Sequence, residues 1–238
     1  MRTMAPRLVV ALDVPAPSRA TSLVERLAPL GVLFKVGYEA FYGYGDVIRE
    51  ALASHEAGYV LDLKLNDIPN TVEAAVHAVV RPGVRLMTVH ALGGAAMLEA
   101  AVGAAEERAA ELGIEPPGIF AVTVLTSIGA EELGELGLAG GPGENAIRLA
   151  ALARDARCRG VVCSVREAPD LKSYFGIEFE TFCPGIRPAG SAHGDQKRAA
   201  TPRDAREAGA DYAVVGRPIT GDADPLAAAR AILAELQG

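Results

Sequence analysis

Short apolar segments alternate with longer, helix-like segments along the whole chain. Eight apolar segments have the length of a β-strand and cover residues 8–14, 32–38, 59–65, 85–90, 119–125, 160–164, 181–184 and 212–216. The segments between them are rich in Ala, Leu, Glu and Arg and predict helices, for example over 95–112, 145–157 and 225–236. Strands that are apolar at nearly every position are typical of a parallel sheet buried on both faces.

The number and order of these segments predict the fold. Eight strand–helix units in 238 residues fit a (β/α)8 TIM barrel, which typically takes about 250 residues. An open, doubly wound α/β sheet is the alternative, but it usually has fewer strands. No linker or low-complexity tract interrupts the pattern, so we expect a single TIM-barrel domain over residues 1–238.

Composition narrows the possible functions. The net charge of −7 disfavours nucleic acid as a partner, and no apolar stretch approaches the roughly 20 residues of a membrane helix. The three cysteines lack a CxxC pairing, which indicates a reducing, cytoplasmic location. The four histidines form no i, i+4 pair, so no metal site is expected.

Charged and polar residues gather where the predicted strands end. In a barrel these carboxyl ends form the active-site face. Each residue also has a structural explanation: Asp13 and Ser127 could cap the helices that follow them, and Lys35 could extend along an amphipathic surface. Their coincidence at one rim favours a site, and its members are Asp13, Lys35, Asp62, Lys64, Thr126, Ser127, Arg187 and Arg217.

The segment from Asp62 to Thr71 carries the most specific chemistry. Asp62 and Lys64 are two residues apart in a strand, so their side chains are expected on the same face. Asp67 follows past the strand end. Two carboxylates around one ammonium predict a charged relay that keeps the lysine protonated as an acid. A solvated charge cluster is the alternative that these ten residues leave open.

The loops after the last two strands predict a phosphate site. Barrel enzymes frequently bind phosphate with these loops and a short helix N-terminus. Here they contain Gln196 and the pair Gly216–Arg217, whose guanidinium can bind an oxyanion through two hydrogen bonds. Lys197 and Arg198 are interpreted as solvent-exposed. The connection over 186–201 is long enough to be a binding loop.

Seven short motifs resemble one enzyme family in the same order along the chain. The sequence resembles orotidine 5′-phosphate decarboxylases, especially the bacterial form, and the matching segments are 10–13, 34–37, 62–71, 122–127, 184–188, 194–198 and 214–220. The continuation Ile-Pro-Asn-Thr at 68–71 is the specific part. Asp-x-Lys-x-x-Asp alone also occurs in sugar-phosphate relatives.

The resemblance implies a reaction. Enzymes of this family convert orotidine 5′-monophosphate to uridine 5′-monophosphate and CO2, the last step of de novo UMP synthesis, without a metal or an organic cofactor. Lys35, Asp62, Lys64 and Asp67 would form the catalytic charge network. Lys64 would protonate C6 of the pyrimidine as CO2 leaves, and Asp62 would face the departing carboxylate.

The resemblance also implies how substrate is bound and how subunits assemble. Asp67 and Thr71 would come from the partner subunit of a homodimer, so that the active sites are shared. The implied substrate contacts are Asp13 and Lys35 at the ribose, Ser127 at the pyrimidine, Gln196, Gly216 and Arg217 at the phosphate, and Ile68, Leu125 and Pro184 along the apolar side of the ring. Thr126 and Arg187 are further residues expected to bind substrate.

Two other classes of protein compete with this interpretation. A sugar-phosphate barrel enzyme would act through a magnesium-bound enediolate, and a non-catalytic barrel would only bind a phosphate. Cys183 stands where the family pattern leads us to expect threonine, which affects packing. His90 is interpreted as a rim histidine and is not assigned a catalytic role.

Overall fold

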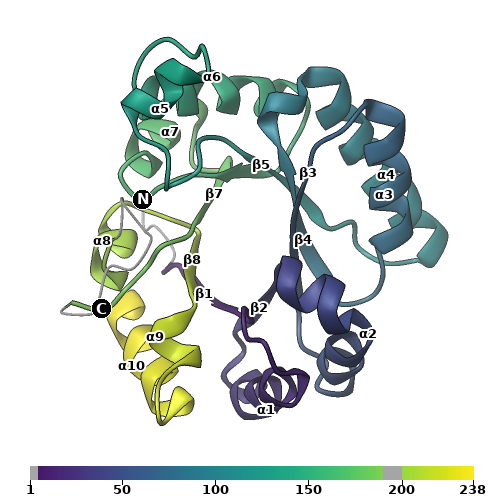
Figure 1. The fold of residues 1–238 in the computed structure, drawn as a ribbon, viewed down its shortest axis with the longest axis vertical. Helices are drawn as coiled ribbons and strands as arrows, with labels where there is room; N and C mark the ends of the chain where they lie inside the picture. Colours follow the sequence, from purple (N-terminus) through teal and green to yellow (C-terminus); the bar gives the residue numbers. More distant parts are fainter. Residues whose placement is uncertain (1–4, 190–199) are drawn as a thin grey trace.

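The chain folds into a closed barrel of parallel strands (Figure 1). The computed structural model describes residues 5–189 and 200–238. The strands pair in chain order, and β8 closes the barrel against β1. They are β1 (Arg7–Ala11), β2 (Leu33–Val36), β3 (Tyr59–Leu65), β4 (Val84–His90), β5 (Gly118–Val122), β6 (Gly160–Val162), β7 (Glu180–Cys183) and β8 (Tyr212–Val215). The predicted (β/α)8 barrel is confirmed, and the open-sheet alternative is wrong.

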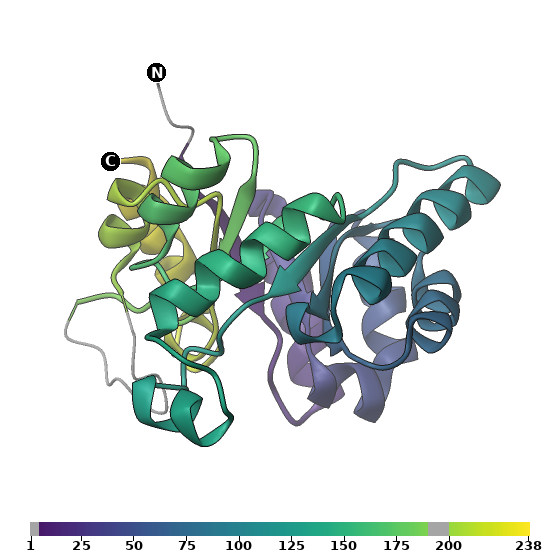
Figure 2. The same ribbon diagram turned by 90° about the horizontal axis from the view of Figure 1, so that it is seen from above.

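Helices lie outside the barrel and alternate with its strands (Figures 1 and 2). They are α1 (Pro17–Leu27), α2 (Tyr38–Ser54), α3 (Pro69–Val79), α4 (Ala95–Leu112), α5 (Ala130–Glu135), α6 (Pro142–Asp155), α7 (Ala168–Phe175), α8 (Pro202–Glu207), α9 (Arg217–Thr220) and α10 (Pro225–Gln237), with 3-10 turns at Ala28–Leu30 and Ala91–Gly93. In the described ranges, no helix has the length and apolar composition needed to cross a membrane.

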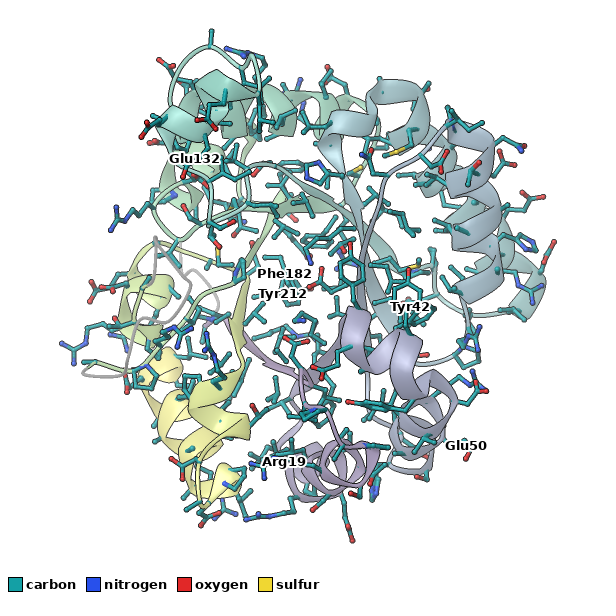
Figure 3. The ribbon with its side chains drawn as sticks, viewed as in Figure 1. Arg19, Tyr42, Glu50, Glu132, Phe182 and Tyr212 are labelled. Atoms are coloured by element: carbon teal, nitrogen blue, oxygen red, sulfur yellow. The ribbon has the colours of Figure 1, made fainter. Side chains whose placement is uncertain are left out.

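The strands are apolar throughout because both of their faces are buried. Along β1, Val9 points into the barrel, whereas Leu8 and Val10 pack against the surrounding helices. Phe182 and Tyr212 lie in the middle of the barrel (Figure 3), and each ring centroid is within 6.2 Å of that of Phe120. The barrel interior is therefore a packed core, and a ligand can be bound only at its ends.

Several predicted strands extend beyond the observed ones at their carboxyl ends. β2 ends at Val36, and Tyr38 already begins α2. β5 ends at Val122, although the Thr123 N–H and hydroxyl still donate to the Val162 carbonyl, at 3.2 and 2.8 Å. The apolar pattern continues past the ladder because rim residues such as Val124 are themselves buried. An apolar sequence pattern therefore does not mark where strand pairing stops, and Tyr38, beyond the end of β2, is apolar although it is exposed.

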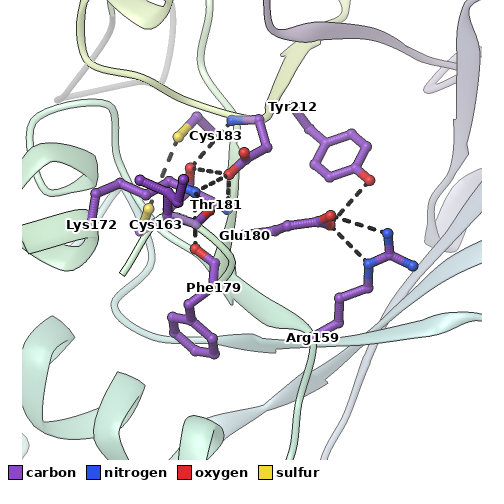
Figure 4. A network of polar contacts seen from close by, with 10 residues as sticks. Arg159, Cys163, Lys172, Phe179, Glu180, Thr181, Cys183 and Tyr212 are labelled. Carbon is purple, nitrogen blue, oxygen red and sulfur yellow. Dashed lines mark hydrogen bonds and ion pairs between the residues drawn. The ribbon is translucent and has the colours of Figure 1, made fainter. Parts of the chain in front are cut away.

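The amino-terminal ends of β6, β7 and β8 are joined by polar contacts (Figure 4). The Arg159 guanidinium donates two hydrogen bonds of 3.0 Å to the Glu180 carboxylate, which also accepts one from the Tyr212 hydroxyl at 3.1 Å. Lys172 donates to Asp211 at 2.7 Å. These contacts hold one end of the barrel together and leave the opposite end for chemistry.

Candidate active site

A cavity of about 540 Å³ opens at the carboxyl ends of the strands. It brings together eleven of the residues predicted to form the site. They are Asp13, Lys35, Asp62, Lys64, Leu125, Thr126, Ser127, Pro184, Arg187, Gly216 and Arg217. Residues distant in sequence meet here because every parallel strand of a closed barrel delivers its last residues to the same rim.

Asp62 is the centre of a charged cluster within this cavity. Its Oδ1 atom accepts a hydrogen bond from Lys64 Nζ at 2.8 Å, and its Oδ2 atom lies 3.4 Å from Lys35 Nζ. The Asp62 side chain is 11% exposed. Lys35 Nζ also donates to both carboxylate oxygens of Asp13, at 3.0 and 3.1 Å. Four charges therefore alternate in sign from Asp13 to Lys64.

The two ammonium groups keep Asp62 ionised. Burial by itself raises the pKa of this carboxyl group, but Lys35 and Lys64 outweigh that effect, so the pKa lies below its ordinary value. The Lys64 side chain is more exposed than that of Asp62, at 27% against 11%. The result is a fixed buried carboxylate that orients a lysine facing the cavity.

The structural explanations offered for Asp13 and Lys35 are wrong. α1 begins after Ala16 without a side-chain cap, and Asp13 pairs with Lys35 instead. Lys35 is buried and does not extend along a surface. The pair fits because residue 37 is glycine: a Cβ atom there would lie 2.8 Å from Asp13 Oδ1 and 2.9 Å from Lys35 Nζ. Gly37 thus provides the space that the ion pair occupies.

His90 and Tyr38 lie beside the charged cluster. Lys64 Nζ is 5.5 Å from the centroid of the Tyr38 ring. Burial and the charge of Lys64 both lower the pKa of His90, which favours its neutral form at neutral pH. The Nδ1 atom of His90 faces the Leu92 N–H at 3.4 Å, which suits a rim histidine with a local structural contact.

The opposite side of the cavity is formed by the segments after β5, β7 and β8. α9 is a single short turn that begins at Arg217, directly after Gly216. Ser127 does not cap the next helix, since Gly129 is the N-cap of α5. The predicted residue Gln196, together with Lys197 and Arg198, lies outside the described residues.

Asp67, Ile68 and Thr71 are predicted site residues that do not line this cavity as the described residues form it. They lie at the start of α3 and are exposed, Ile68 by 66%. The Asp67 carboxylate accepts a hydrogen bond from the Ile68 N–H at 2.6 Å. One chain therefore presents part of the predicted site on an outer surface.

The sequence and the fold both match a known enzyme family. Residues 6–232 match the family model described as orotidine 5′-phosphate decarboxylase / HUMPS family. The chain belongs to this family. The family resemblance and the enzyme class predicted from the sequence are confirmed.

Individual orotidine 5′-phosphate decarboxylases are similar over nearly the whole chain. The enzyme of Halorhodospira halophila is 50% identical, over 97% of this chain and 96% of its own length. That of Moorella thermoacetica is 47% identical, over 97% and 92%. The crystal structure of the Lactobacillus acidophilus enzyme has a TM-score of 0.85 at 36% identity, covering 98% of this chain and 100% of that one.

Two residues of this decarboxylase-family site, Gly37 and Thr88, are not predicted from the sequence as site residues. In the sequence, Gly37 is noticed only as the last residue of the motif at 34–37, although its lack of a side chain makes the Asp13–Lys35 pair possible. Thr88 is not predicted at all, yet its hydroxyl donates to Asp62 Oδ1 at 2.9 Å. A polar residue in the apolar strand β4 is the signal that could have revealed it. Among the described residues, no three His, Cys, Asp or Glu side chains form a group suited to a metal ion.

Proposed function

We propose that this chain decarboxylates orotidine 5′-monophosphate to uridine 5′-monophosphate without a metal, and that Lys64 is the proton donor. The observation that carries the proposal is the Lys35–Asp62–Lys64 array at the base of the cavity. Its buried carboxylate is ionised and lies 2.8 Å from an ammonium that faces the open space.

The array suits each step of the chemistry. The bond between C6 and the carboxylate breaks, CO2 leaves, and the electron pair remains on C6 in the plane of the ring, where the π-system does not delocalise it. The Lys64 ammonium stabilises this charge and then transfers a proton to C6. The Asp62 carboxylate holds the Lys64 ammonium in place through their 2.8 Å contact and repels the substrate carboxylate. Solvent reprotonates the lysine after product leaves.

The remainder of the cavity supports binding of a nucleotide monophosphate. We assign Asp13 and Lys35 to the ribose hydroxyls, Thr126 and Ser127 to the pyrimidine, and Leu125 and Pro184 to its apolar side. Gly216, Arg217, Arg187 and Gln196 are assigned to the phosphate. The short helix α9 directly after β8 is the arrangement that many barrels use for this group. Phosphate binding far from C6 can contribute energy to the decarboxylation step.

A homodimer with shared active sites is part of the proposal. Asp67, Ile68 and Thr71 are exposed at the start of α3, on the same side of the barrel as the cavity. Placed against a second copy, they would complete that copy's site, with Asp67 as the fourth member of the charge network. The exposed apolar side chain of Ile68 is consistent with burial in such an interface.

We also infer a cytoplasmic location, a single functional domain over residues 1–238 and no nucleic acid partner. Support comes from the three cysteines, which are all free and buried, and from the net charge of −7. The Sγ atoms of Cys163 and Cys183 are 3.9 Å apart, within hydrogen-bond distance, and both cysteines are free thiols. A pair of thiols this close persists in a reducing compartment.

The proposal is tested by the loss of orotidine monophosphate absorbance on adding the purified protein, with and without EDTA. We expect rapid conversion to uridine monophosphate that EDTA does not affect. Lys64→Ala removes both the charge and the proton and is expected to lower kcat at least about 10³-fold. Arg154→Ala removes a surface cation that is 52% exposed and pairs with Asp155, and it serves as the matched control.

The three possible failures differ. Activity that EDTA stops would contradict the metal-free mechanism. A Lys64→Ala variant with wild-type kcat would remove Lys64 from the mechanism. A folded protein that does not convert this substrate would overturn the substrate assignment and direct the search to sugar phosphates with magnesium.

A further inference from the structure

The pairing of β3 with β4 is interrupted at the charged cluster. Leu61 pairs with Met87, and the next pair is Leu65 with Val89. Residues 62–64 of β3 are therefore opposite a single residue of β4, Thr88. A bulge of this kind redirects side chains and leaves backbone groups without their usual ladder partners.

Lys64 has an unusual backbone conformation within this bulge. Its φ of 44° is in the left-handed region that disfavours residues with a Cβ atom. Among the described residues, Glu56 and Arg157 are the other non-glycine residues with positive φ, and both follow the end of a helix. That position commonly adopts this conformation, whereas the inside of a strand does not. The surroundings of Lys64 must therefore stabilise it.

Thr88 makes two hydrogen bonds across the bulge. Its Oγ1 atom accepts the Lys64 backbone N–H at 2.9 Å and donates to Asp62 Oδ1 at 2.9 Å. The direction of each bond is fixed, because an N–H only donates and an ionised carboxylate only accepts. Thr88 is 1% exposed, so water does not replace either bond. One buried hydroxyl thus connects the backbone of the lysine to the carboxylate that pairs with it.

We propose that Thr88 is a positioning residue for the decarboxylation. Its hydroxyl holds Lys64 in the left-handed conformation and fixes the Asp62 carboxylate, so that the ammonium points into the cavity. The inference rests on the roles proposed above for Asp62 and Lys64. Thr88 itself does not line the cavity formed by the described residues and so acts through these two side chains.

The alternative explanation is that Thr88 only fills space in the strand. Valine has nearly the same shape and lacks the hydroxyl, so Thr88→Val leaves the Lys64 N–H and one Asp62 lone pair without a partner in a buried place. Thr88→Ser keeps the hydroxyl and loses the methyl group. Comparing the two variants separates hydrogen bonding from packing.

The test measures kcat, KM and their pH dependence for orotidine monophosphate with the intact protein. For Thr88→Val we expect kcat to fall about ten- to hundredfold, while the dissociation constant of the product, uridine monophosphate, changes less than about threefold. Burial raises the pKa of Asp62, and Lys35, Lys64 and then the Thr88 hydrogen bond lower it. Removing that bond should therefore move the acid limb of kcat/KM to higher pH. Thr88→Ser should restore both the rate and the pH profile.

Each outcome decides the matter. Wild-type kcat and pH profile in Thr88→Val would overturn the inference. If Thr88→Val does not fold, as judged by circular dichroism, the decision passes to Thr88→Ser, which keeps the hydroxyl and removes only the methyl group. Wild-type kcat in Thr88→Ser would support the inference, whereas a large loss of kcat would show that the hydroxyl is not sufficient to position Lys64 and would overturn it. Asp62→Asn is measured in the same series. A variant of Asp62 with full activity contradicts its proposed role, whereas loss in Asp62→Asn without loss in Thr88→Val contradicts only the role of Thr88.

Discussion

At the scale of single residues, the site depends on one carboxylate that remains charged although it is buried. Asp62 has little contact with water but three donors or cations around it, from Lys35, Lys64 and Thr88. An isolated buried carboxylate would be protonated. Here the neighbours reverse that preference, and the same contacts that stabilise the charge hold it in position for chemistry.

This balance makes part of the stability dependent on pH. Because the pKa of Asp62 is lower in the folded protein than in the unfolded chain, its ionised form stabilises the fold above the unfolded value of about 3.9, and this contribution is lost as pH falls through the folded pKa. We expect Asp62→Asn to lower the free energy of unfolding by about 2 kcal/mol at pH 6. The difference from the wild type should shrink below about pH 4. Urea unfolding at several pH values measures it.

A surface carboxylate provides the control. Asp155 is 66% exposed and pairs with Arg154, so Asp155→Asn should change the unfolding free energy by less than about 0.5 kcal/mol. A difference between wild type and Asp62→Asn that stays constant from pH 6 to about pH 2 would show that the charge of Asp62 does not stabilise the fold.

At the scale of elements, the junction of β2 and α2 shows how local geometry makes room for charge. Gly37 has a φ of −93°, which alanine also adopts. Replacing it would therefore not strain the backbone, but the new Cβ would displace the Asp13–Lys35 pair. Since these atoms are the ends of flexible side chains, Gly37→Ala should lower stability by less than about 1 kcal/mol. Its kcat/KM should fall about ten- to hundredfold, because misplaced catalytic groups are costly.

Gly103→Ala in α4 is the matched control. No heavy atom lies within 4 Å of the Cβ that it would add, and Gly103 is inside a helix. It should leave kcat/KM unchanged and raise stability by up to about 1 kcal/mol. If both variants reduced kcat/KM equally, or if Gly37→Ala left it unchanged, the space at residue 37 would have no bearing on the ion pair.

The helices and strands also show how much of the fold could be predicted from the sequence. Eight apolar segments were sufficient to predict the barrel, because a two-sided parallel sheet requires them. The exact ends of the strands could not be predicted, since Tyr38 and Leu125 are apolar although strand pairing has already ended at Val36 and Val122. Thr88 could not be recognised because its role arises from the bulge opposite it, which is a property of two strands together.

At the scale of the whole molecule, the two ends of the barrel differ: polar contacts stabilise one end, and the cavity lies at the other. One end is joined by the Arg159–Glu180–Tyr212 contacts, the middle is filled by aromatic side chains, and the other end is open. Sequence could predict which residues reach the open end, because strand direction alone determines that. It could not predict from local pattern that Asp67 and Thr71 are turned outward, and only the family resemblance suggested a second subunit.

The shared site can be tested by mixing two inactive variants. Lys64→Ala removes the acid from a subunit's own cavity, and Asp67→Ala removes the residue that the subunit is proposed to lend. In a hybrid dimer, one site carries both defects and the other is intact. After subunits are exchanged at random, about a quarter of wild-type activity should return, because half of the dimers are hybrids with one native site each.

The hybrid experiment has its own control in a mixture of Lys64→Ala with Asp62→Ala. Both changes lie in the cavity of the same chain, so in a hybrid each subunit retains one of the two defects and no native site forms. Activity that returns only in the Lys64→Ala and Asp67→Ala mixture, and that rises as subunits exchange, would place Asp67 in the neighbouring site. No recovery, with subunit exchange shown by mass spectrometry of the mixed dimers, would mean that each chain completes its own site and that the exposure of Asp67 has another cause.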